Sequence, residues 1–487
     1  RPPRSTLFPY TTLFRSILLS TGFSFGLPAS GEWRFSLAAP DPQADGGASS
    51  LRLGKMGLEM PLPRISITGE GTGGTGAVRC RAEAGPLRAV TPEAELRVKT
   101  LTMDTDIRFG GPEPVQGTLS FGGKEATLTA DLAGDRAVLR LPSLSLAGDA
   151  VLAPSQGLRF NGKADLAEAG LTLPGSRASV EGIRLSLPLT WPWGISDTAG
   201  SLEWRAFRRE RQEMGALKGR LRPRPEGLGF EGEFTARLLP GLTVKLTGEA
   251  PFLVPGKASA LSWSTRYRPA RPLDLGRLTP GAKGMTIEGT LRVDGRMAFG
   301  GGSAASGEMS ASLGGGRITA REKDLRVEDL RLDLRLPALP AIWSAPAQSL
   351  SLGRATLGKI RIEEADLRFQ IEPGRSLLIE QSRFTWCGGR VSTQAVRIAP
   401  GMTDLDLILH CDRLNLAQLL DQLGAARAEG KGAVNGRLPL RLRNGTVRFE
   451  DGFFYSTPGD SGVIHVTGAR VLRAGIQIGR ASCRERV

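Results

Sequence analysis

The chain has 487 residues, of which 40% are hydrophobic, so it is long enough to bury a core in several domains or in one extended domain. Its 64 Gly and 32 Pro exceed their usual combined share of roughly 12%, but they lack the three-residue period of collagen. The formal net charge of +15 comes from scattered Lys and Arg residues, which excludes the usual form of a nucleic-acid-binding tail, and two His residues leave little material for a zinc site.

The two ends of the chain read as translated DNA from outside the gene. When Thr6 to Ser16 are back-translated with suitable codons, the opposite DNA strand encodes Ile478 to Val487 letter for letter. Such ends are typical of a sequencing adapter carried into an assembly, so residues 1–16 and 478–487 are interpreted as adapter-derived. They carry six Arg and one Glu, and without them the net charge falls from +15 to +10. The remainder is interpreted as an internal fragment.

Residues 17–345 are predicted to form an elongated β-rich region. Apolar and polar side chains alternate at 33–37, 96–101 and 325–336, as expected for half-buried strands. Breaks such as Asn161–Gly162 are interpreted as turns between antiparallel strands. Four leucines are expected to share one strand face, opposite a face of Arg and Asp side chains: Leu330, Leu332, Leu334 and Leu336.

Residues 346–477 are predicted to form a C-terminal block that contains a short helix at 415–424. Its leucines recur at helical spacing, Asn415 and Gln418 can form an N-terminal cap, and Gly424 supplies the stop. A second helix is expected near 340–349. Alternation returns near 438–442, where three leucines are expected on one face: Leu438, Leu440 and Leu442.

Nothing in the sequence marks a catalytic or cofactor site. Gly-rich runs such as Gly314–Gly316 are not followed by a helix or by Lys-Ser/Thr, so they lack the context of a phosphate-binding loop. Cys80, Cys387 and Cys411 have no metal-ligand spacing. They are interpreted as buried free thiols or, for Cys387 and Cys411, as one disulfide in an oxidising compartment. We expect no enzyme activity, no metal, no cofactor and no nucleic-acid partner.

The predicted fold is mainly β, an elongated, curled antiparallel β-sheet with few short helices. One face of this sheet would be apolar, and the sheet itself, a partner or an apolar ligand must cover it. Alternation alone leaves open whether the leucine rows line a groove or pack two sheets into a sandwich. The seven leucines named above are therefore candidate groove or core residues.

The stretch from Asp412 to Val466 resembles the C-terminal block of the YdbH family, also labelled a dicarboxylate-transport domain, within the AsmA-like superfamily. Upstream, Phe384–Val391 resembles the strand and Gly-Gly turn that precede this block in the family. Besides the short helix, the matching segments are Glu429–Gly432, Val434–Leu440, Asn444–Gly445, Glu450–Gly452 and Pro458–Ile464.

The resemblance implies a non-enzymatic intermembrane transport protein that spans the periplasm of a diderm bacterium, with an inner-membrane anchor that this fragment lacks. A long, curled sheet would carry the acyl chains of phospholipids along an apolar groove. The C-terminal end would meet a small outer-membrane lipoprotein. Phe453 and Phe454 are candidate partner contacts, and at most one of them can face the groove because adjacent strand residues point to opposite faces.

Two other functions are compatible with a β-rich chain. The first alternative is a structural or adhesive surface protein that resembles an autotransporter passenger. A polysaccharide-active β-solenoid enzyme is a weaker alternative, because such an enzyme needs clustered carboxylates and aromatic platforms, and the chain has only three Tyr.

Overall fold

The computed structural model describes residues 32–467 and 477–478, except for short gaps. The gaps are 39–47, 54–55, 62, 93, 111–113, 133–134, 154–156, 195–197, 211, 278–281, 403, 425–426, 444–445, 450–451, 457–461 and 468–476. The segments interpreted as adapter-derived lie outside the described residues except for Ile478, and so do Asn444–Gly445 and the first part of Pro458–Ile464, two of the segments that match the family.

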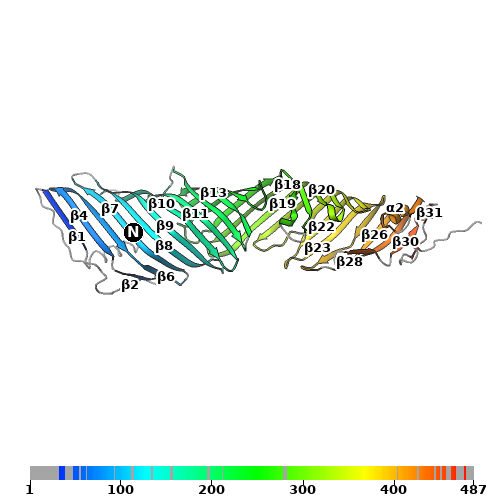
Figure 1. Cartoon of the computed structure of the whole chain (residues 1–487), viewed down its shortest axis with the longest axis horizontal. Helices are drawn as coiled ribbons and strands as arrows, with labels where there is room; N and C mark the ends of the chain where they lie inside the picture. Colours follow the sequence, from blue (N-terminus) through cyan, green and yellow to red (C-terminus); the bar gives the residue numbers. More distant parts are fainter. Residues whose placement is uncertain are drawn as a thin grey trace, which may run out of the picture. The chain divides into compact units, whose positions relative to one another are not determined.

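The chain divides into two compact units, residues 1–169 with 188–193, and residues 170–187 with 194–487. Within the first unit, β1, β4, β5, β7, β8 and β9 follow one another as antiparallel neighbours, and β2, β3 and β6 continue beside one part of β7 (Figure 1). The strands that lie wholly or mostly in this unit are β1 (Glu32–Ala38), β2 (Ala48–Leu53), β3 (Met56–Pro61), β4 (Arg64–Thr72), β5 (Thr75–Ala84), β6 (Leu87–Val90), β7 (Ala94–Phe109), β8 (Val115–Leu132), β9 (Asp135–Ala153) and β10 (Gly157–Leu173).

In the second unit, consecutive strands also pair antiparallel (Figure 1). Its first strands are β11 (Ala178–Trp191), β12 (Gly200–Arg209), β13 (Gln212–Arg224), β14 (Gly227–Ala236), β15 (Thr243–Ala250), β16 (Ser259–Tyr267), β17 (Leu273–Asp274), β18 (Met285–Gly300), β19 (Ser303–Ala320), β20 (Leu325–Leu339) and β21 (Gln348–Leu357). Two short 3-10 helices join strands here: η2 (Leu275–Arg277) and η4 (Arg321–Lys323).

The rest of this unit consists of shorter strands and a helix, α2 (Leu416–Gln422). The strands are β22 (Ile360–Ile371), β23 (Leu377–Trp386), β24 (Gly389–Thr393), β25 (Val396–Ile398), β26 (Leu405–Asn415), β27 (Arg427–Lys431), β28 (Ala433–Arg443), β29 (Thr446–Phe449), β30 (Phe453–Ser456), β31 (Val463–Thr467) and β32 (Gln477–Ile478). Among the described residues, β27 and β31 form a small separate sheet, and the remaining strands form one 30-stranded sheet that is not closed. The prediction of a mainly β, antiparallel fold is confirmed.

Several local predictions can be compared with these elements. The helix at 415–424 is confirmed as α2 with Asn415 at its N-cap. The helix near 340–349 is wrong, because β21 begins at Gln348 and the backbone amides before it bond to strands: Ser344 donates to Ile371 and Ala345 donates to Arg335. Asn161–Gly162 is not a turn but lies inside β10, where Gly162 makes room for the ring of Phe160.

A line of β-bulges crosses neighbouring strands of the second unit. Register shifts occur on β18, β19 and β22, and the backbone takes a positive φ at Gly289, Gly315, Asp329 and Glu364. Gly353 on β21 continues the line, because a Cβ there would touch the side chain of Asp329. We call these five residues the bulge line. Since each bulge bends its strand and increases the local twist, a row of bulges creases the sheet along one direction.

The crease depends on residues that tolerate the left-handed backbone conformation. Asp329 has φ of 55°, a region in which a β-branched side chain is strongly disfavoured. We expect Asp329→Val to lower the free energy of unfolding by about 1–2 kcal/mol, measured by urea denaturation. Asp329→Asn is the control and should stay within about 0.5 kcal/mol, since Asn also adopts this conformation. Equal effects of both substitutions would show that the bulge does not require the left-handed conformation at Asp329.

Candidate functional site

The second unit carries a continuous apolar face. Cross-strand register, which places paired side chains on the same face, connects nine neighbouring strands from β11 to β20 in one row. The row consists of Leu185, Leu202, Gly219, Gly232, Leu246, Trp263, Gly295, Met309 and Leu336. We call the face that holds this row the apolar face, and the opposite one the polar face.

The predicted leucines of β20 all lie on the apolar face. Leu332 pairs with Leu313 on one side and Leu350 on the other. Leu330 and Leu336 are buried, at 7% and 5% exposed, whereas Leu332 and Leu334 are half-buried. The intervening Arg331, Asp333 and Arg335 are exposed on the polar face. The alternation is therefore as predicted, and most of this face is neither packed as a core nor open to water.

The three predicted leucines of β28 share the apolar face but have different surroundings. Leu438 is 1% exposed and belongs to a hydrophobic cluster with Val391, Leu409 and Leu419, the last of which comes from α2. Leu440 packs against the edge of this cluster, and Leu442 is half-buried outside it. Helix α2 thus turns one part of the apolar face into a closed core. Leu438 is a core residue here, whereas Leu442 lies where the face is not covered by the helix.

Helix α2 is held in place at both of its ends. Asn415 accepts a hydrogen bond from the backbone amide of Gln418 at 3.0 Å, which satisfies one amide of the first turn. At the other end, the side-chain oxygen of Gln422 accepts from the Trp386 indole and from the Arg361 amide, each at 2.9 Å. These bonds connect the helix to β22 and β23, which are distant from it in sequence.

The two predicted partner contacts are separated by the pleat of β30. Phe454 is 1% exposed and lies in the cluster beneath α2, opposite Gly436 in β28. Phe453 is 47% exposed and lies beside Tyr455, with ring centroids 5.9 Å apart. The expectation that only one of the pair can point to the apolar side is consistent with this arrangement, and contact with a partner stays a prediction for Phe453.

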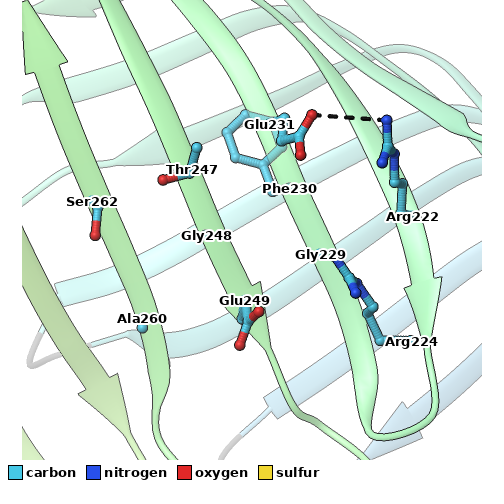
Figure 2. A pocket seen from close by; sticks show the side chains of 10 residues that line it. All are labelled: Arg222, Arg224, Gly229, Phe230, Glu231, Thr247, Gly248, Glu249, Ala260 and Ser262. Carbon is cyan, nitrogen blue, oxygen red and sulfur yellow. Dashed lines mark ion pairs between the residues drawn. The ribbon is translucent and has the colours of Figure 1, made fainter.

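The polar face carries ion pairs rather than an apolar strip. On it, Glu308 contacts Arg296 at 2.8 Å and Arg335 at 3.2 Å, so it connects three strands. The hydrogen bond from Arg335, together with the charge of Arg296, lowers the pKa of the Glu308 carboxyl below its ordinary value. This face also has a hollow of about 280 Å³ near β13, β14 and β15. Figure 2 shows its charged lining, with Arg222 and Glu231 paired at 3.9 Å, so the hollow does not suit an acyl chain.

The glycines of the apolar face were not predicted from the sequence. In β14, Phe230, Gly232 and Phe234 are in phase and alternate with Glu231 and Glu233. Glycine was treated as a break between strands, although this alternation identifies Gly232 as an apolar-face position.

No helix among the described residues is long and apolar enough to cross a membrane. A model of the YdbH-like family, described as intermembrane phospholipid transport protein YdbH, matches residues 24–477. Residues 1–16 and 478–487 fall outside this match. Comparison with the curated proteins and with the solved structures gave no match.

The anchoring of α2 can be tested at Gln422. Gln422→Ala leaves the buried Trp386 indole without this acceptor, so we expect the free energy of unfolding to fall by about 1–3 kcal/mol. Hydrogen exchange at α2 should speed up at the same time. Gln422→Glu is the matched control, because it keeps an acceptor oxygen. An unchanged stability of Gln422→Ala would mean that the two hydrogen bonds do not hold the helix.

The thiols under α2 provide a second test. Cys387 and Cys411 are buried free cysteines in the structure, and burial raises the pKa of each thiol to about 12. At about pH 8 we expect neither to react with iodoacetamide in the folded chain, whereas both should react in denaturant. Peptide mass mapping of the alkylated residues is the measurement. The partly exposed Cys80 is the internal control and should react faster, and rapid native-state labelling of Cys411 would contradict the closed core.

Proposed function

Because the chain belongs to the YdbH-like family of intermembrane phospholipid transport proteins, we propose that its apolar face carries the acyl chains of phospholipids between two membranes. The observation that supports this proposal best is that side chains on the apolar face, such as Leu332 and Leu334, are half-buried. In a sandwich, a second sheet would bury them fully, as α2 does for Leu438. An apolar ligand is the occupant that fits a face left in this state.

For binding an acyl chain, the free energy of transfer from water favours a long apolar strip over a single pocket. Each CH₂ that leaves water contributes about 0.8 kcal/mol, so an acyl chain gains affinity in proportion to the length of apolar surface it contacts. The row from Leu185 to Leu336 offers such a surface without polar side chains. A chain bound along it has no single deep minimum, which allows it to move from one strand to the next. The lipid headgroup would stay in water.

The protein's role in this proposal is non-enzymatic and periplasmic. The protein would be anchored in the inner membrane, and a small outer-membrane lipoprotein would meet the C-terminal block, residues 346–477. The exposed Phe453 and its neighbour Tyr455 support a contact surface in that block. The same block contains the helix-covered core, whereas the strands from β11 to β20 would supply the path.

Photo-crosslinking tests the path at two adjacent residues. With the chain exported to the periplasm of a diderm bacterium, a photo-reactive residue at Leu334 should give phospholipid adducts that mass spectrometry detects. The same residue at Asp333 is the matched control, because it points to the polar face, and its yield should be lower by about tenfold or more. Similar yields at both positions, or no adduct at any position on the apolar face, would contradict the proposal.

A further inference from the structure

Aromatic rings on the apolar face lie over glycines of neighbouring strands. A Cβ built at Gly295 would overlap three atoms of the Trp263 indole, on the adjacent strand β16. These three are the atoms nearest to that Cβ. The ring of Phe230 covers Gly232 on its own strand β14 and Gly219 on β13, which pair with each other in the next row. Since a Cβ at these sites cannot coexist with the ring position, each glycine is the reason that the ring can lie close over it.

A ring that lies close over a glycine leaves space free above the apolar face. It raises the surface by about one carbon contact distance, roughly 3.5–4 Å, whereas a ring that stands away from the sheet projects its full length into the space above. Gly295 lies in the middle of the apolar row, between Trp263 and Met309. An acyl chain that follows the row has to pass over this point, because Leu246 and Leu336 lie on its two sides.

We propose that the Trp263–Gly295 pair sets the clearance of the lipid path, and that Gly295 is a specificity-determining residue which keeps room for an acyl chain. This inference rests on the proposed function, since clearance matters only if chains move along the face. The ring also contributes apolar area to the path. The pair therefore meets two requirements: apolar contact with the acyl chain, and space for the acyl chain above the ring. The Phe230 ring over Gly219 and Gly232 would act in the same way two strands away.

The test uses the substitution Gly295→Ala, which forces the Trp263 ring off the sheet. Photo-reactive residues at Leu202 and Leu334 report acyl chains on the two sides of the pair. We expect Gly295→Ala to lower the adduct yield at one of the two positions relative to the other by about tenfold, the smallest effect of a methylene-sized obstacle in an apolar site. The double variant Trp263→Ala with Gly295→Ala should restore the wild-type ratio, because the displaced ring is then absent.

Two further variants decide the outcome. Gly314→Ala is the matched control: Gly314 lies on the polar face of the neighbouring strand β19, a Cβ there meets nothing within 4 Å, and the ratio should not change. Trp263→Ala alone should keep adducts at both positions, and this variant decides the matter if Gly295→Ala does not fold. An unchanged ratio in Gly295→Ala, a failure of the double variant to restore it, or loss of adducts in Trp263→Ala would overturn the proposal.

The same experiment separates this inference from the proposed function. If the unsubstituted chain gives no lipid adduct at Leu202 or at Leu334, acyl chains do not use the apolar face and the proposed function fails. If adducts form at both positions and the substitutions leave their ratio unchanged, transport along the face stands and only the role of the Trp263–Gly295 pair is rejected.

Discussion

A sheet with one apolar face and one charged face has to shelter the apolar side chains even where no second layer packs on them. In the second unit, the strands from β11 to β20 meet this requirement with a row of half-buried side chains and with bulges that crease the sheet. The crease is built from residues in the left-handed conformation, such as Gly289 and Asp329. Because a bulge bends its strand, the line of bulges bends the sheet at β18, β19 and β20.

Helix α2 shows what the same face becomes when a second layer is present. Leu438 and Leu332 both lie in alternating segments of their strands, Leu438 after Arg437 and Leu332 after Arg331, yet Leu438 is fully buried and Leu332 is not. The difference comes from the leucines of α2, which pack on β24, β26 and β28. A closed core at this place stabilises the block and removes part of the face from any ligand. The open part of β28 is then at Leu442, so a lipid path in this block would follow one side of the strands.

The sequence allowed the strand alternation and α2 to be predicted, because both depend on local periodicity and caps, as the leucines of 330–336 and Asn415 illustrate. It did not distinguish groove from core, since Leu438 and Leu442 have the same pattern and differ only in what a distant helix covers. Asn161–Gly162 has a composition that favours a turn, whereas the pairing of β10 with β9 keeps it in a strand, with the ring of Phe160 over Gly162. The Trp263–Gly295 pair joins residues of two strands that are far apart in sequence, so register alone reveals it.

The polar face helps to determine what the apolar face can do. Arg296, Glu308 and Arg335 form an ion-pair triad across β18, β19 and β20, and each is the direct neighbour of a residue in the apolar row, namely Gly295, Met309 and Leu336. A slip of one residue between these strands would exchange the two faces and bring the charges of the triad into the apolar row. Exposed ion pairs add little to overall stability, but these are sensitive to register because each bond spans two strands. The charges on one face thereby help to keep Gly295, Met309 and Leu336 together in the apolar row on the other.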